Sequence, residues 1–172
     1  MYERCKKPQG QATSYKGVFV VDAHRVRKYL VSHGVHYEVE HHSPAFTAQE
    51  VAAVEHLPGR KFAKPVIVNA DGRLVMTVLS ANRLVDLDKV KAVLGSDDVR
   101  LAREEEFAPI FDDCERGAEP PFGNLYGLPV LVDDDLPLDE IVFNAGSHTE
   151  TMKVSTTEYL ALVHPVKADL AL

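Results

Sequence analysis

Residues 61–80, KFAKPVIVNADGRLVMTVLS, constrain the fold more than any other stretch of the chain. Two segments rich in β-branched and other apolar residues are joined there by Asp71-Gly72. Asp-Gly between two such segments is a strong signal for a two-residue hairpin turn, because both central positions of that turn need a positive φ. We therefore expect a β-hairpin in the middle of the chain.

Before this hairpin, the pattern of apolar residues predicts a helix and then a strand. Val26, Tyr29 and Leu30 recur at helical spacing after Asp22, which can cap the helix, and Gly34 can end it. The next stretch, VHYEVEHH, alternates polar and apolar residues, as a strand with one buried face does.

Capping signals indicate three further helices. We expect them in TAQEVAAVEHL, with a capping box of Thr47 and Glu50; in DLDKVKAVLG, between Asp86 and Gly95; and in TTEYLALV, with a second capping box of Ser155 and Glu158.

The remaining elements complete a mixed architecture. EEEFAPIF is expected to form a short helix, and LYGLPVLVD, DEIVFNAG and TETMKVS are expected to form strands. Helices and strands that interleave through hairpins and longer crossovers predict an α+β (mixed α/β) fold with a central mixed β-sheet flanked by helices. With 172 residues, one domain is expected. We assign residues 1–18, which lack periodicity, to a loose basic extension and residues 19–172 to the domain.

Composition narrows the class of protein. Hydrophobic residues make up 45% and charged residues 26% of the chain, and no apolar run approaches the length of a membrane span. The first residues lack the apolar core of a signal peptide, so we expect a cytoplasmic protein without a membrane partner. Cys5 and Cys114 lie in no CxxC pair and are expected to be reduced thiols.

The charge is distributed unevenly. The net charge is −7, yet residues 1–28 carry seven Lys or Arg against two acidic residues. Such a segment is in general more often a solvated face than a binding surface. A basic edge on an acidic body can also contact a phosphate backbone. The acidic total argues against a duplex-DNA partner but leaves contact with an RNA end open.

Several common chemistries lack support. GxGxxG, GxxxxGK[ST], HExxH and GxSxG do not occur. In a strand, His36 and His42 would share a face and His41 would point away, which leaves too few ligands for zinc. Asp133-Asp134-Asp135 lacks the glycine and spacing of an EF-hand. We therefore expect neither a metal nor another cofactor.

Three features remain that ordinary folding does not fully explain. Lys64 lies within the apolar stretch FAKPVIV, where it points either to the open face or into a pocket. His148 follows a turn in GSHTE, residues 146–150, where local hydrogen bonding could account for it. DDCERGAEPPFG, residues 112–123, is a stiff loop without Ser, His or Lys.

These stretches, taken together and in order, resemble the YbaK / prolyl-tRNA synthetase-associated domain family of aminoacyl-tRNA deacylases. The resemblance rests on the AK of the apolar strand, the GAxPPFG loop, LYGLPVLVD and AGSHTETMKVS, and it extends from about Val20 to Val163. It implies a protein that hydrolyses the ester of mischarged tRNA and binds the tRNA acceptor end.

The resemblance also implies the site residues. Lys64 would hold the acceptor end, the backbone of the loop that begins at Gly117 would line the aminoacyl pocket, and His148 would face it. The other residues expected to bind substrate are Ala118, Pro120, Pro121, Phe122, Gly123, Gly146 and Ser147. The family loop has an apolar residue where this chain has Glu119, which makes the amino acid removed less certain.

The expected chemistry needs little from side chains. Because an aminoacyl ester is already activated, its hydrolysis needs a positioned water and stabilisation of the oxyanion more than a strong nucleophile. Gly117 allows close approach of the backbone and Pro120-Pro121 stiffens the turn, while Lys64 would act as a point charge on phosphate or ribose.

The sequence leaves three functions open. The first is a free-standing trans-editing deacylase acting on proline tRNA charged with Cys or Ala, or on another small amino acid, with prolyl-tRNA synthetase as a further partner. The second is a non-catalytic module that binds tRNA or a synthetase, and the third is a small-molecule-binding domain. The oligomeric state is not predicted.

Overall fold

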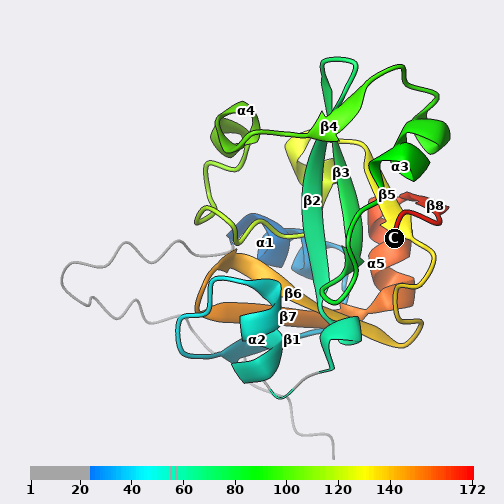
Figure 1. Ribbon diagram of the computed structural model, residues 1–172. Coiled ribbons are helices and arrows are strands. Elements are labelled where there is room, and N and C mark those ends of the chain that lie inside the picture. The colour runs from blue at the N-terminus through cyan, green and yellow to red at the C-terminus, as the bar shows by residue number, and fades with distance from the viewer. Residues whose placement is uncertain (1–23, 55, 57) are drawn as a thin grey trace, which may run out of the picture.

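A computed structural model describes residues 24–172 except 55 and 57. The predicted extension at residues 1–18, the cap at Asp22, the start of the domain near residue 19 and Cys5 lie outside the described residues. Figure 1 shows the elements in chain order, with a long vertical hairpin at the centre.

The predicted hairpin is confirmed. It consists of β2 (Ala63–Ala70) and β3 (Arg73–Ser80), which are antiparallel throughout. At the turn, Asp71 has a φ of 49° and Gly72 a φ of 83°. The Asn69 side chain accepts a hydrogen bond from the Gly72 N–H at 2.8 Å, which closes the turn.

The hairpin lies inside a five-stranded mixed sheet with the order β4-β2-β3-β5-β8. The additional strands are β4 (Val99–Leu101), β5 (Val130–Asp133) and β8 (Val166–Ala168). β4 pairs antiparallel with β2, whereas β5 is parallel to both β3 and β8. The sequence predicts β5 but neither β4 nor β8, since three residues are too few to show a pattern.

The other strands form a separate antiparallel sheet instead of extending the central one. Its order is β1-β7-β6, from β1 (Tyr37–His41), β7 (Glu150–Ser155) and β6 (Glu140–Ser147). In Figure 1 this sheet crosses the lower end of the β2–β3 hairpin. The two sheets meet where Phe62, just before β2, forms a parallel bridge with Val142 of β6.

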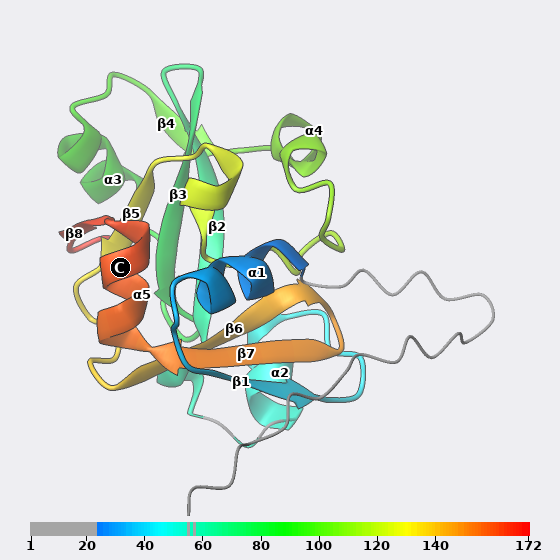
Figure 2. The same ribbon diagram turned by 180° about the vertical axis from the view of Figure 1, so that it is seen from behind.

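Five α-helices surround the sheets in the described part of the chain: α1 (His24–Ser32), α2 (Ala48–Val54), α3 (Leu87–Leu94), α4 (Glu104–Phe107) and α5 (Thr156–Val163). Figure 2 shows α1 and α5 on the near side of the molecule, with α1 across β6 and β7. Short 3₁₀ turns occupy Gly59–Lys61, Ala108–Ile110 and Gly123–Tyr126. The mixed α+β fold is therefore confirmed, with two sheets in place of one.

The predicted caps have different outcomes. Thr47 and Glu50 form the reciprocal capping box, and Asp86 accepts hydrogen bonds from two N–H groups of α3. The predicted capping box at Ser155 is wrong, because the Ser155 side chain makes no cap hydrogen bond. The first N–H of α5, that of Thr156, donates instead to the Asp139 carbonyl at 3.1 Å.

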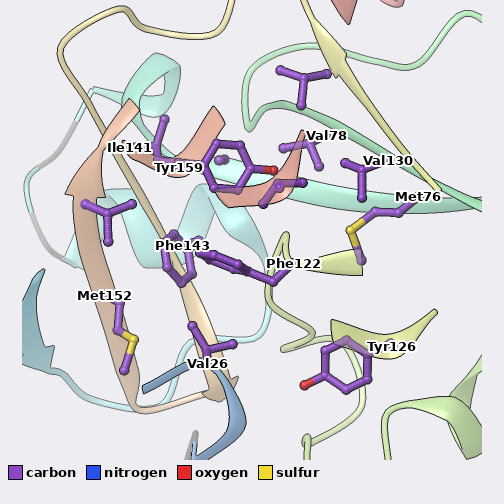
Figure 3. Close-up of a cluster of buried hydrophobic side chains, with 14 of the residues drawn as sticks. Val26, Met76, Val78, Phe122, Tyr126, Val130, Ile141, Phe143, Met152 and Tyr159 are labelled. Carbon is purple, nitrogen blue, oxygen red and sulfur yellow. The ribbon is translucent and has the colours of Figure 1, made fainter. Parts of the chain in front are cut away.

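An aromatic core lies between the three-stranded sheet, α1 and α5. Phe122 is fully buried and packs edge-on against Phe143 and Tyr159, with ring centroids 5.4 and 5.3 Å away (Figure 3). The Tyr159 hydroxyl donates a hydrogen bond of 2.7 Å to the Pro121 carbonyl. This core therefore fixes the position of the Gly/Pro-rich loop from below. No helix among the described residues is both long and apolar enough to span a membrane.

Candidate active site

The Gly/Pro-rich loop is hydrogen-bonded to an irregularity in β6. The β6–β7 register shifts between Asn144 and Ser147, and Gly146 in this bulge has a φ of 88°. The Gly146 N–H donates to the Ala118 carbonyl at 3.0 Å, and the Gly146 carbonyl accepts from the Glu115 N–H at 2.8 Å. The bulge exposes a backbone donor and acceptor to the loop, so its glycine supports the loop by main-chain contacts.

His148 lies in the tight connection between β6 and β7. Its backbone N–H donates to the Glu115 carboxylate at 2.7 Å, and its Nε2 lies 2.8 Å from the Arg116 carbonyl. Because a carbonyl only accepts, Nε2 must carry the proton, which leaves Nδ1 as the free nitrogen of a neutral ring. Nδ1 is buried and has no partner among the described residues.

The imidazole of His148 also packs between the loop and an exposed aromatic side chain. Its Cε1 lies 3.6 Å from the position that a Cβ would take on Gly117, which has a φ of 82°. Its ring centroid is 4.8 Å from that of Phe46, a side chain that is 66% exposed. His148 therefore contacts the backbone of the loop and does not line the cavity described next.

The residue that the sequence selects in β2 does point into a cavity. Lys64 lines a cavity of about 350 Å³ and is half-buried. Its Nζ donates to the Ala81 carbonyl at 3.1 Å, which also accepts from the Gln49 side chain of α2. Within the described part of the chain, no acidic side chain forms an ion pair with Lys64. Burial lowers the pKa of its ammonium below the usual range.

The cavity is mainly apolar and has walls from distant parts of the sequence. They come from β2, the N-terminus of α2, the end of β4, α4, the Gly/Pro-rich loop and β6: Ala48, Phe62, Lys64, Pro65, Val66, Ile67, Leu101, Ala102, Phe107, Gly117, Glu119 and Asn144. Convergence of a few polar groups on an apolar hollow is typical of small-ligand sites.

One wall is held by a bidentate ion pair outside the cavity. Arg100 of β4 donates two hydrogen bonds of 2.7 Å to Glu106 of α4, and Asn69 donates a third to the same carboxylate. These contacts keep the pKa of Glu106 far below its usual range. They fix α4, and with it Phe107, at the edge of the cavity.

Glu119 provides a carboxylate inside the cavity. The residue is only 9% exposed, and its Oε1 accepts a hydrogen bond from the Gly117 N–H at 3.1 Å. The sequence placed Glu119 at the lip of the pocket, but the carboxylate lies in its wall. The Gly117 N–H, which was expected to face a reacting ester, is thus occupied by a side chain of its own loop.

Asn144 of β6 is a further polar residue of the cavity. It is 7% exposed, and its Oδ1 has no hydrogen-bond partner among the described residues. A buried amide without a partner is costly unless a ligand or water satisfies it. Sequence reasoning missed this residue, although an asparagine inside the apolar strand EIVFNAGS was a visible signal.

The structure brings only some of the predicted site residues to the cavity. Lys64 and Gly117 line it, and His148 packs behind Gly117. The other predicted substrate-binding residues are buried and are absent from the cavity wall: Ala118, Pro120, Pro121, Phe122, Gly123, Gly146 and Ser147. Phe122 belongs to the aromatic core, and Gly123 packs against Val130 and Leu128 because there is no room there for a side chain.

Metal chemistry finds no ligand set within residues 24–172 except 55 and 57, where no three His, Cys, Asp or Glu side chains gather in a way that could hold an ion. Cys114 lies beside the loop and is mostly buried. Burial, with a contribution from Asp113, raises the pKa of its thiol to about 12. A neutral thiol is a poor nucleophile, so Cys114 is not suited to covalent catalysis.

Comparison with known proteins gives consistent results. The family model of the aminoacyl-tRNA editing domain matches residues 42–162. The multifunctional Ser/Thr-tRNA deacylase ProXp-y of Escherichia coli strain K12 is 26% identical over 142 residues, which cover 79% of this chain and 84% of that protein.

Solved structures show the same fold. A candidate trans-editing enzyme for prolyl tRNA synthetase superposes with a TM-score of 0.78 at 25% identity, over 91% of this chain and 99% of the other. A hypothetical protein gives the same TM-score at 22% identity, over 86% of this chain and 99% of its own.

Proposed function

The chain belongs to the aminoacyl-tRNA editing domain family and is an aminoacyl-tRNA deacylase, and from this premise we propose that it acts in trans on tRNA charged with a small amino acid. The observation that carries the proposal is the cavity in which Lys64, Gly117 and Glu119 meet. It has room for a small aminoacyl group, and its mouth carries a cation.

Hydroxyl-bearing amino acids are the first substrates to consider. ProXp-y is named as a Ser/Thr-tRNA deacylase, and the unpaired Asn144 amide gives this cavity a polar group that a substrate hydroxyl could satisfy. An unsatisfied buried polar group favours a substrate that completes its hydrogen bonds over one that does not. We therefore place Ser and Thr ahead of Ala and Cys, which the sequence suggested.

Hydrolysis on this scaffold would rest on position and electrostatics. Lys64 would bind the terminal phosphate or ribose of the tRNA as a point charge, which places the ester over the cavity. The Gly117 N–H would stabilise the oxyanion once it is free to do so. A ribose hydroxyl next to the ester would orient the attacking water.

A panel of charged tRNAs tests the proposal. Purified protein is incubated with tRNA carrying Ser, Thr, Ala or Cys, on proline and on cognate acceptors, and loss of the ester is followed against buffer alone. We expect hydrolysis of Ser- or Thr-charged tRNA. If none of these esters is hydrolysed above the uncatalysed rate, the substrate class is wrong.

Lys64→Met identifies the role of the lysine, since methionine keeps most of its length without the charge. Loss of a charge-assisted contact predicts a fall in kcat/KM of about 10- to 100-fold. Lys91→Met, at an exposed position of α3, is the matched control and should leave hydrolysis unchanged. Equal activity of both variants would remove Lys64 from the mechanism.

Association with prolyl-tRNA synthetase stays a prediction, as does a cytoplasmic location. A pull-down of that synthetase with this protein, with and without uncharged tRNA, would test the first.

A further inference from the structure

The carboxylate of Glu119 is unusual in its surroundings. It lies in the wall of a mainly apolar cavity, 9% exposed, and its single hydrogen bond in the described structure joins Oε1 to the Gly117 N–H. Oε2 has no partner among the described residues. Lys64 lines the same cavity but forms no ion pair with it there. A buried carboxylate with an unused oxygen favours a cationic partner.

A second acceptor of the cavity has the same requirement. Asn144 is 93% buried by its 7% exposed fraction, lines the same hollow and leaves Oδ1 unpaired within the described residues. The amide belongs to β6 and the carboxylate to the Gly/Pro-rich loop, so the two acceptors are presented independently. Both would be satisfied by a ligand group with several N–H donors.

We propose that Glu119, with Asn144 beside the same cavity, binds the α-ammonium group of the aminoacyl ester, and thereby limits the enzyme to esters with a free α-amino group. The inference rests on the proposed function. The α-ammonium carries three donors and a positive charge, and it lies on the carbon next to the reacting carbonyl. Lys64 and Glu119 would then recognise opposite charges of one substrate, phosphate at the mouth and ammonium inside.

Binding the ammonium would also change the loop. Glu119 now accepts the Gly117 N–H, the donor that an oxyanion would need. When the carboxylate turns to the stronger, charged donor, it gives up this bond and the N–H becomes available to the carbonyl oxygen. No covalent bond changes in this exchange. A correctly seated amino group would therefore complete the donor set.

The test compares one charged tRNA with its deaminated counterpart. Treatment of seryl-tRNA with nitrous acid replaces the α-ammonium by a hydroxyl of similar size. For each ester, kcat/KM is divided by its uncatalysed hydrolysis rate, which removes the intrinsic difference between the esters. We expect the wild type to prefer the amino ester by about 10- to 100-fold.

Glu119→Gln separates charge from shape, because its amide oxygen can still accept the Gly117 N–H. The preference for the amino ester should fall to about threefold or less in this variant, whereas Glu105→Gln, at an exposed carboxylate of α4, should retain it. A thermal unfolding curve like that of the wild type shows that Glu119→Gln is folded. If it is not, the wild-type preference is compared with that of Asn144→Asp, which should increase it.

The outcomes distinguish the two levels of the argument. Hydrolysis of both esters with equal efficiency by the wild type, or a preference that persists in Glu119→Gln, overturns the role of Glu119 and leaves the deacylase standing. Absence of any hydrolysis of the amino ester contradicts the proposed substrate class instead.

Discussion

At the scale of single residues, the backbone of Gly117 is the feature on which the site most depends. With a φ of 82°, the residue occupies the left-handed region that favours glycine. A Cβ there would be in ordinary contact with the His148 ring at 3.6 Å, so backbone strain and not a clash is the cost of a side chain.

Gly117→Ala is therefore expected to destabilise the protein by about 1–2 kcal/mol and to reduce deacylation strongly, because the loop shifts to relieve the strain. Gly95→Ala is the matched control. Gly95 ends α3 with a φ of 62° and has open space around it, so its replacement should cost similar stability and leave activity intact. Urea unfolding and deacylation rates of both variants check this. Equal activity of the two would contradict a special role for Gly117.

Cys114 permits a prediction on reactivity. Because the pKa of its thiol is raised to about 12, the reactive thiolate is rare at pH 8. In a Cys5→Ser background, iodoacetamide should modify the native protein at least about 100-fold more slowly than the protein unfolded in guanidinium. Comparable rates would show that the thiol is accessible and ionised.

The same shift gives stability a defined pH dependence. In the unfolded chain the thiol loses its proton near pH 8.5, whereas in the folded protein it keeps it to about pH 12. The contribution of Cys114 to stability is therefore lost progressively as the pH rises above about 8.5.

Single residues also show how far the sequence can predict a site. Lys64 was identifiable because a charge in an apolar strand has few ordinary explanations. The bond of Glu119 to the Gly117 N–H and the burial of Phe122 in the core were not, since the side-chain directions in a loop depend on contacts with β6 and α5 that no local pattern records.

At the scale of elements, the helices follow the sequence closely because their caps are local signals. Asp86 accepts from two N–H groups of α3, whereas Ser155 accepts from none of α5. Asp86→Ala should therefore lower the free energy of unfolding by about 1 kcal/mol, and Ser155→Ala by clearly less. Chemical denaturation of both variants provides the measurement. A larger loss for Ser155→Ala would restore the capping box that the structure lacks.

The division of the strands between two sheets was not predictable in the same way. Alternation of apolar residues shows that a strand exists and which face it buries, but it does not identify its partners. The β6–β7 hairpin pairs with β1, which lies more than a hundred residues earlier in the chain, and not with its nearer neighbour β5.

At the scale of the whole molecule, the uneven charge of the sequence suggests how a tRNA approaches. We propose that residues 1–18, with four Lys or Arg, add contacts to the phosphate backbone of the tRNA. Deletion of these residues should leave thermal unfolding unchanged, weaken tRNA binding and make the salt dependence of log Kd shallower. Filter binding across a salt series measures this. An unchanged slope would show that these residues make no phosphate contacts.

The cavity between two sheets also determines when activity can appear as the chain folds. Each wall contains a local hairpin, β2–β3 and β6–β7, which can form early because its strands are neighbours in the sequence. Lys64 and Asn144 meet only after the two sheets have docked across the Phe62–Val142 bridge. During refolding, ester hydrolysis therefore cannot recover before that docking, however early the circular dichroism signal of the strands returns.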